Sequence, residues 1–291
     1  MTQRYDTISF LSDYGLRDEF VGIVKCVIAE IAPHARVIDL THDIAPFDVR
    51  AGSLAIARCI SYVPSGIVLA VVDPGVGTSR RAVAVSVGNG RGVLIGPDNG
   101  LLSMGTALAG GADAAVVLNN PEYQLGAPGA TFAGRDIFAP AAAHLCNGVP
   151  FGELGEAIDA NLLLPGVVPL SRTEADGIVA EITWVDRYGN CQLNVGPEEV
   201  AMLGKKLSVT FTTVAGERVT RSAAVVDNFS AIGGGIGLVI DSFGMLAICV
   251  DRGSAADELA ITVGDAVTLS LLAQPDGVTT SVQLRRDPKS N

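Results

Sequence analysis

The chain has 291 residues, of which 48% are hydrophobic, so it is long enough for two ordinary domains and is not a disordered protein. Its 31 acidic and 20 basic residues give a formal net charge of −11. This charge argues against a nucleic-acid groove, and it fits either a cationic small-molecule substrate or simple solubility.

The amino terminus lacks the basic-then-apolar pattern of a signal peptide, because Met-Thr-Gln-Arg-Tyr-Asp runs directly into an apolar stretch. No window of the sequence holds about 18 uninterrupted apolar residues, the length that a membrane-spanning helix needs. We therefore expect a cytoplasmic protein that makes no use of a membrane.

From residue 7 to about residue 150, short apolar runs alternate with helical patterns. This alternation predicts an α/β domain over residues 1–170, with a mostly parallel sheet sandwiched by helices. The predicted strands are residues 8–11, 37–40, 67–72, 82–87, 92–95 and 115–118, and the predicted helices are residues 19–31, 51–63 and 136–146.

Polar residues follow several of these strands, and ligands of such sheets bind beyond the carboxyl ends of the strands. The strand-end residues are Ser12, Asp13, Asp43, Asp73, Asp98 and Asn99. The most informative stretch is residues 71–81, where an apolar strand delivers Asp73, two turn glycines and then Arg80, seven residues after the acid.

A segment with Pro and Gly, residues 162–172, leads to a second region of alternating β-type runs without a convincing helix. This pattern predicts a small antiparallel barrel or sandwich over residues 176–291. Its predicted strands are residues 178–185, 207–213, 223–226, 238–240, 246–250, 266–272 and 278–284. Residues 233–237 indicate a glycine turn rather than a phosphate cradle, since no Lys-Ser/Thr follows them.

The five cysteines are scattered, without Cys-x-x-Cys pairs, and most lie in apolar runs. We therefore expect small core residues in a reducing compartment, with neither a disulfide framework nor a zinc site. The cysteines are Cys26, Cys59, Cys146, Cys191 and Cys249.

Seven motifs occur in a fixed order along nearly the whole chain. They are Phe-Leu-Ser-Asp-Tyr-Gly at 10–15, Thr-His-Asp-Ile-Ala-Pro-Phe-Asp-Val at 41–49, Asp-Pro-Gly-Val-Gly-Thr at 73–78, Gly-Pro-Asp-Asn-Gly at 96–100, Gly-Arg-Asp at 134–136, Val-Asp-Arg-Tyr-Gly-Asn at 185–190 and Asp-Ser-Phe-Gly at 241–244. In order and spacing the chain resembles the S-adenosyl-L-methionine (SAM) hydroxide adenosyltransferases, the SAM hydrolases, which are related to the SAM-dependent fluorinase and chlorinase.

The resemblance implies an α/β amino domain, a carboxyl-terminal antiparallel β-barrel, and a homotrimer with SAM bound between neighbouring subunits. It implies no cofactor, because SAM is the substrate and adenosine and L-methionine are the products. By position, Asp13 matches the carboxylate that accepts both ribose hydroxyls, a role that suits an acceptor-only group with two oxygens. The alternative role for Asp13 is to cap a helix.

Further substrate-binding roles follow from the same resemblance. Asp186 matches the acid that binds the methionine ammonium group, assisted by Ser242, although a simple turn acid is the alternative. The aromatic surfaces around ribose and adenine fall on Phe47, Tyr188 and Phe229, and the amide for the adenine edge falls on Asn190. The related halogenases carry an arginine after the serine for the methionine carboxylate, whereas this chain has Phe243, so the carboxylate-binding group is not identified.

In the family, an Asp–Arg–His set positions and activates water. Asp73 and Arg80 fill the first two places, with a merely structural salt bridge as the alternative. The third place departs from the family, because Phe-Ala-Gly-Arg-Asp at 132–136 puts Ala133 where the hydrolases have histidine. General-base positioning is typically worth roughly 10²–10⁴-fold, so the resemblance implies a slow enzyme.

Three explanations of Ala133 stay open. The alanine is an introduced substitution, or a natural variant that uses another base or Asp73 and Arg80 alone, or the mark of a halide-using relative. A carboxylate at position 73 would repel chloride, which argues against the last. Hypotheses from other classes are a SAM- or adenosine-binding module without turnover and a metal-dependent hydrolase, which the dispersed acids and scarce histidines weaken.

Overall fold

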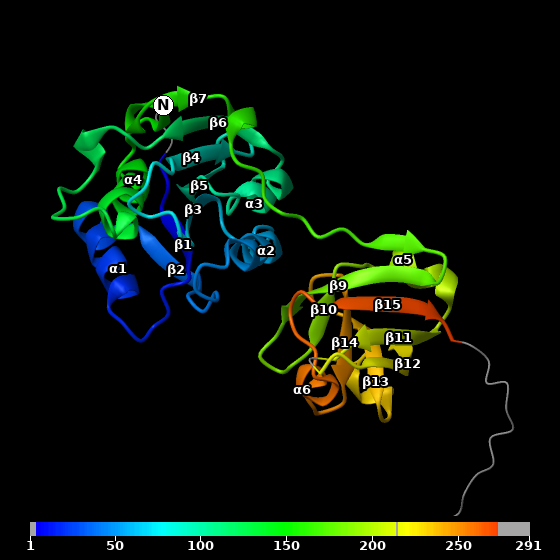
Figure 1. Ribbon diagram of the computed structural model, residues 1–291. Coiled ribbons are helices and arrows are strands. Elements are labelled where there is room, and N and C mark those ends of the chain that lie inside the picture. The colour runs from blue at the N-terminus through cyan, green and yellow to red at the C-terminus, as the bar shows by residue number, and fades with distance from the viewer. Residues whose placement is uncertain (1–3, 214, 273–291) are drawn as a thin grey trace, which may run out of the picture. The chain divides into compact units, whose positions relative to one another are not determined.

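The computed structural model describes residues 4–213 and 215–272, and the chain divides into two compact units between Val168 and Pro169. Figure 1 shows that each unit has its own sheet. Each unit also has its own buried core. The predicted strand at residues 278–284 lies outside the described residues.

The first unit is built on a seven-stranded sheet in the order β2-β1-β3-β5-β4-β6-β7. Its strands are β1 (Thr7–Ser12), β2 (Arg36–Thr41), β3 (Gly66–Val71), β4 (Ala82–Val87), β5 (Gly92–Pro97), β6 (Ala112–Val117) and β7 (Ala157–Ile158). Strands β2, β1, β3 and β5 are parallel to one another, whereas β4 and β7 are antiparallel to the strands beside them. Since β6 is antiparallel to β4, it points the same way as β5, so the mostly parallel sheet is confirmed.

Helices cover both faces of this sheet, two on each (Figure 1). The first face holds α1 (Phe20–Ile31) and α4 (Ala139–Cys146), and the second holds α2 (Val49–Cys59) and α3 (Ser103–Leu108). Strand β3 is buried along its whole length, with Ile67 and Leu69 in one core and Val68 and Ala70 in the other. A strand covered on both faces reads as a continuous apolar run, which is why the sequence predicts it well.

The second unit is a closed barrel. Its strands follow the order β10-β14-β13-β12-β11-β15-β9, and β9 pairs back onto β10, while β8 extends the sheet beyond β9. These strands are β8 (Arg172–Glu174), β9 (Gly177–Val185), β10 (Cys191–Leu193), β11 (Lys206–Thr212), β12 (Arg218–Val226), β13 (Ile236–Ile240), β14 (Leu246–Val250) and β15 (Ala266–Leu271). The barrel prediction is confirmed, except that the pair β12–β13 is parallel. The connection between these two strands crosses over instead of turning tightly.

Short helical segments complete the two units. They are α5 (Pro197–Val200), α6 (Ala255–Leu259), the π-helix η2 (Gly134–Phe138) and the 3₁₀ turns η1 (Pro121–Tyr123), η3 (Phe151–Leu154), η4 (Ala160–Leu162), η5 (Ala201–Leu203) and η6 (Phe229–Ile232). Two of them, α5 and α6, lie in the region for which no convincing helix is predicted. Each is too short to show a helical period.

Other differences from the prediction have local causes. Helix α2 ends at Cys59 instead of residue 63, because Pro64 has no N–H to donate to the Ile60 carbonyl and its ring clashes with that carbonyl in a helix. Strand β12 begins at Arg218, five residues earlier than predicted. The prediction missed its first half because that half is polar and largely exposed. The predicted helix at 136–146 opens as the π-helix η2 before it becomes α4.

Three cysteines, Cys146, Cys191 and Cys249, are buried as predicted, and burial raises the pKa of each thiol to about 12. Cys59 is half-buried, and Cys26 is exposed, so the prediction of a core position is wrong for Cys26. All five thiols are free. Within the described ranges, no helix is long and apolar enough to cross a membrane.

Candidate active site

Two of the predicted acids follow neighbouring parallel strands of the first unit. Ser12 at the end of β1 pairs with Val71 at the end of β3, and the backbone N–H of Asp13 donates to the Val71 carbonyl over 3.3 Å. Asp73 follows two residues after that carbonyl. The fold therefore brings Asp13 and Asp73 to the same edge of the sheet, where ligands of such sheets bind.

Asp13 is tied to the predicted aromatic residue Phe47. Its Oδ2 accepts the backbone N–H of Phe47 over 2.9 Å, and Phe47 adopts a left-handed backbone with φ of 70°. A bulky residue in this conformation is strained, and such strain persists only where the surroundings impose it. The Phe47 side chain is 71% exposed, so its ring offers an open aromatic face beside Asp13. Helix α1 begins after Glu19, whose side chain makes no capping bond, so Asp13 is not its cap.

Asp73 and Arg80 form a buried, two-point ion pair. Arg80 Nε donates to Asp73 Oδ1 over 2.9 Å, and Nη2 donates to Oδ2. The side chains are only 5% and 11% exposed, and the guanidinium also lies over the Phe138 ring, 5.5 Å from its centroid. Burial raises the pKa of Asp73, Arg80 opposes this rise without cancelling it, and the Asp13 carboxylate adds to it.

Ala133 is buried, 6% exposed, at the residue before η2. The next residue, Gly134, lies against Tyr14, and a Cβ atom built on it would lie 2.2 Å from the Tyr14 hydroxyl oxygen. The Tyr14 ring packs edge-on against Phe132, with centroids 5.7 Å apart, and lies tilted against Phe20 with centroids 5.6 Å apart. The residue after Ala133 thus contacts a tyrosine hydroxyl, and Ala133 belongs to the same apolar cluster as Tyr14.

The sequence analysis assigns no role to Tyr14, although it lies in the first motif. Burial raises the pKa of Tyr14, and the carboxylates of Asp13 and Asp73 raise it further, while the Gly134 N–H and the Arg80 guanidinium oppose the rise. The hydroxyl lies against Gly134, and Tyr14 follows Asp13 directly in the chain, so Tyr14 stands at the sheet edge that carries Asp13 and Asp73. The signal that could have found it is an aromatic residue directly after a strand-end acid.

A second set of polar side chains fixes the ends of β1 and β2. Ser12 Oγ is 2.8 Å from His42 Nδ1, and His42 Nε2 is 3.1 Å from Asp39 Oδ1. Lys25 Nζ donates to Asp39 Oδ2 over 2.6 Å, and the bonds from Lys25 and His42 lower the pKa of Asp39 although partial burial opposes this. Ser12 and His42 are buried, so this chain orders the loop that carries Phe47.

Two further strand-end polar residues, Asp98 and Asn99, bind other groups of the first unit. Asp98 is buried and binds the Arg81 guanidinium and the backbone N–H of Leu164. The Asn99 amide donates to the Val72 carbonyl over 2.9 Å. Both act as structural residues of the first unit.

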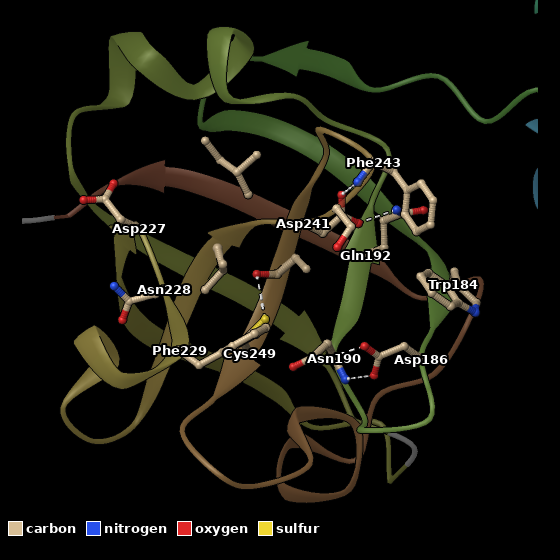
Figure 2. Close-up of a pocket in the computed structure, with 14 residues that line it drawn as sticks. Trp184, Asp186, Asn190, Gln192, Asp227, Asn228, Phe229, Asp241, Phe243 and Cys249 are labelled. Carbon is tan, nitrogen blue, oxygen red and sulfur yellow. Dashed lines mark hydrogen bonds between the residues drawn. The ribbon is translucent and has the colours of Figure 1, made fainter. Parts of the chain in front are cut away.

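The predicted residues of the second unit gather around a cavity of about 250 Å³ on the barrel (Figure 2). Asp186, Asn190, Phe229 and Ser242 line it. They also line an adjoining cavity of about 740 Å³, which Tyr188 and Arg252 share. Lining residues that the sequence analysis missed are Trp184, Gln192, Asp227, Asn228, Asp241 and Cys249.

Asp186 organises its own loop. Its Oδ1 accepts the backbone N–H groups of Tyr188 and Asn190 over 2.8 and 2.9 Å, and its Oδ2 accepts the Asn190 side-chain amide over 2.8 Å (Figure 2). This arrangement orients the Asn190 amide and leaves the Tyr188 ring 77% exposed. A carboxylate has about four acceptor sites, so Asp186 keeps capacity for one further donor.

A similar turn presents Ser242. Asp241 Oδ1 accepts the backbone N–H groups of Phe243 and Met245 over 2.8 and 3.0 Å, and Gln192 donates to Asp241 Oδ2. The Phe243 ring packs edge-on against Trp184, with centroids 5.9 Å apart. Phe229 opens η6 and is half exposed above the same cavity. The cavity therefore joins carboxylates with aromatic faces, a combination that suits an organic cation.

No group of three or more His, Cys, Asp or Glu side chains in residues 4–213 and 215–272 could hold a metal ion. Of the strand-end acids, Asp13 accepts a backbone N–H group, and Asp73 and Asp98 are paired with arginines. These acids are thus arranged for hydrogen bonding.

Comparisons with known proteins match both units. Residues 8–155 match the SAM hydroxide adenosyltransferase N-terminal domain, and residues 180–268 match its C-terminal domain. A protein from Salinispora arenicola named (R)-S-adenosyl-L-methionine hydrolase is 44% identical over 258 residues, which cover 89% of this chain and 95% of that relative. A fluorinase from Actinoplanes sp. is 27% identical over 289 residues, which cover 90% of this chain and 97% of the relative.

A solved structure agrees with the fold. The crystal structure of an uncharacterized conserved protein from Thermotoga maritima superposes with a TM-score of 0.82 at 32% sequence identity. The match covers 90% of this chain and 99% of that one.

Proposed function

Because the chain belongs to the SAM hydroxide adenosyltransferase family, we propose that it hydrolyses S-adenosyl-L-methionine, the reaction named for its relative from Salinispora. The products are adenosine and L-methionine. The observation that carries this proposal is the buried pair of Asp73 and Arg80, which stands at the ligand-binding edge of the sheet beside Asp13. This pair can order a water molecule and accept its proton.

The reaction is an in-line displacement at the ribose C5′. The oxygen of water bonds to C5′ while the C5′–S bond breaks, and the electron pair of that bond goes to sulfur, which leaves as the neutral thioether of methionine. The surplus proton of the water passes to the Asp73 carboxylate and then to solvent. The sulfonium charge disappears along this path, so a dry pocket favours the transition state, and holding the water about 3 Å from C5′ supplies much of the rest.

Asp73 suits the role of proton acceptor. Its raised pKa gives it a higher proton affinity than an exposed aspartate has, which brings it nearer to the ideal for a general base. Arg80 holds the carboxylate in one orientation by two hydrogen bonds. Each carboxylate oxygen retains a lone pair for water.

The remaining residues bind the substrate. Asp13, with one oxygen on the Phe47 N–H, accepts the ribose hydroxyls, and Phe47 covers the sugar. Asp186 and Ser242 bind the methionine ammonium group, and Asn190 binds the adenine edge. The exposed rings of Tyr188 and Phe229 supply aromatic surfaces for ribose and adenine.

Ala133 makes this enzyme slow relative to a hydrolase with histidine at that position. Its methyl group can neither accept a proton nor bind water, so the loss of general-base positioning falls in the range of roughly 10²–10⁴-fold. The proposed reaction needs no cofactor. The proposed assembly is a homotrimer in the cytoplasm with SAM between neighbouring subunits, as the resemblance implies.

One observation favours a second candidate, a SAM- or adenosine-binding module without turnover. Ala133 leaves the set of Asp73 and Arg80 without an imidazole, and the two could then serve only as a structural ion pair. A halide-using relative is disfavoured, since the Asp73 carboxylate would repel the anion.

The test incubates SAM with the protein, with the Ala133→His variant and with Asp73→Asn, and follows adenosine and methionine by chromatography, with and without chloride. We expect equal amounts of both products from the parent, faster formation from Ala133→His and none above background from Asp73→Asn. Adenosine from neither the parent nor Ala133→His would overturn the proposal in favour of a binding module. A chloride-dependent 5′-chloro product would assign the chain to the halogenases.

A further inference from the structure

Tyr14 occupies a position that a packing role does not explain. Its ring is held between Phe20 and Phe132, with centroid separations of 5.6 and 5.7 Å, so the aromatic body is fixed by apolar contacts alone. A phenylalanine would make the same contacts. The hydroxyl is an additional polar group on a partly buried residue, at the edge of the sheet where Asp13 and Asp73 stand.

The Tyr14 hydroxyl oxygen lies against the Gly134 backbone, so close that a Cβ atom built on Gly134 would be 2.2 Å from it. Among the hydrogen bonds of the described residues, none takes the hydroxyl proton. The hydroxyl proton is therefore available to a water molecule or a ligand at this edge of the sheet.

The charges around Tyr14 keep the hydroxyl protonated. Asp13 and Asp73 both raise the pKa of Tyr14 above its ordinary value, in addition to the effect of burial. The group is therefore a neutral O–H donor throughout the pH range in which the protein is used. A neutral donor at the same sheet edge as the Asp73 carboxylate can hold one water molecule between donor and acceptor.

The hydroxyl also stands next to the position that departs from the hydrolases. Ala133 directly precedes Gly134, and a Cβ atom at 134 would come within 2.2 Å of the Tyr14 oxygen. The small Ala133 side chain contributes no polar atom here, whereas Tyr14 does. A polar contact to the attacking water is thus available from a different element of the fold.

We propose that the Tyr14 hydroxyl binds and orients the attacking water in place of the imidazole that is absent at Ala133. This inference rests on the proposed SAM hydrolysis. The phenol O–H donates a hydrogen bond to the water oxygen, the same water donates a hydrogen bond to Asp73 and gives up its proton there during attack, and the remaining lone pair of its oxygen faces C5′. Tyr14 itself stays neutral, so no proton is gained or lost on it during the reaction.

The test replaces Tyr14 by Phe, which keeps the ring and removes the oxygen. Tyr5→Phe is the matched control, because Tyr5 also lies in the first unit and donates its hydroxyl to a backbone carbonyl, that of Gly90, over 2.9 Å. We expect Tyr14→Phe to lower kcat by at least tenfold with KM within about twofold of the parent. Tyr5→Phe should leave both constants unchanged. If the Tyr14 hydroxyl only contacts Gly134, Tyr14→Phe should change the melting temperature and leave kcat unchanged.

A second variant separates water binding from any indirect effect. In an Ala133→His background the imidazole can hold the water, so Tyr14→Phe should cost less than threefold in kcat there. Parent-like kcat in Tyr14→Phe, or an equal loss in both backgrounds, overturns the role of Tyr14 while the proposed function stands. If the parent protein forms no adenosine, the proposed function is wrong, and the proposed role of Tyr14 is wrong with it.

Discussion

Gly134 and Tyr14, 120 positions apart in the chain, are in such close contact that a methyl group on Gly134 would lie 2.2 Å from the Tyr14 hydroxyl oxygen and 3.1 Å from its Cζ atom. The glycine is therefore required for steric reasons and not for a left-handed backbone, since Gly134 is not among the glycines with positive φ. The contact joins the segment after β1 to the start of η2.

Gly134→Ala should destabilise the first unit by about 1–3 kcal/mol, because the tyrosine ring or η2 must shift to admit the methyl group. Gly22→Ala is the control: Gly22 lies in α1 with open space around it, and alanine there should stabilise by about 0.5–1 kcal/mol. Urea unfolding of both variants measures the difference. Equal stability of the two variants would show that the contact is relaxed in solution.

Arg80→Lys should lower kcat by roughly 10²-fold, because a lysine cannot reproduce the two parallel hydrogen bonds to Asp73. Binding of a non-hydrolysable SAM analogue should stay within a few-fold of the parent in calorimetry, since Arg80 is not proposed to contact the substrate. Arg81→Lys, which alters the neighbouring pair with Asp98, is the matched control and should retain kcat. Loss of analogue binding in Arg80→Lys, with no turnover in any variant, would support the binding-module alternative.

The raised pKa of Asp73 sets a pH dependence. If Asp73 accepts the proton of water, kcat/KM should fall as the pH falls through a value above 3.8, the ordinary pKa of an aspartate. Stability has the opposite sign: a raised folded-state pKa means that the folded protein binds the proton more tightly, so this contribution is present below pH 3.8 and is lost as the pH rises through the folded-state pKa. Asp73→Asn should remove both effects, and the difference between parent and variant across the pH range measures them. A rate profile that is flat through this region would exclude Asp73 as the base.

Asp186→Ala should raise KM for SAM by at least tenfold, with a smaller change in kcat. The substitution removes the acceptor of three hydrogen bonds, so the Asn190 amide loses its orientation together with the proposed ammonium-binding group. Asp227 lines the same cavity and is the control, so the KM of Asp227→Asn should stay within about threefold of the parent. Parent-like kinetics in Asp186→Ala would place substrate binding elsewhere.

His42→Phe should destabilise the protein by about 1–3 kcal/mol, because the buried Ser12 hydroxyl loses its His42 partner and keeps only the backbone N–H of Tyr14. KM should rise as well, since the loop between His42 and Phe47 is no longer fixed. Lys25→Ala, at the exposed end of the same chain of bonds, should cost less than about 1 kcal/mol. Thermal unfolding and initial rates on both variants test this, and an equal effect of the two substitutions would contradict it.

Much of the fold could be predicted because burial leaves a local mark. Strand β3 is apolar throughout since helices cover both of its faces, and the barrel strands alternate because only one face is buried. Helix α3 left no such mark, since six residues with a glycine among them show no period. The parallel pair β12–β13 was likewise hidden, as the direction of a strand is decided by its connection and not by its composition.

The candidate site divides in the same way. Asp13, Asp73 and Arg80 could be found from their place after apolar strands, and the Asp186 turn has a local sequence signal in Asp-Arg-Tyr-Gly-Asn. The contact between Tyr14 and Gly134 could not, because it depends on how two distant segments meet. Trp184, Gln192 and Asp241 were missed for a similar reason: they come from different strands and turns, and only the closed barrel brings them to one cavity.

The π-helix η2 connects position 133, which belongs to the proposed active site, to helix α4. The Ala139 N–H reaches back five residues to the Gly134 carbonyl, so this turn contains one residue more than an α-helical turn. Each residue of an α-helix rotates the chain by about 100°, and removing one residue here would swing Ala133 a quarter-turn or more away from the sheet edge. A change in the length of the segment between 133 and 139 would therefore alter the direction in which the side chain at 133 points relative to α4.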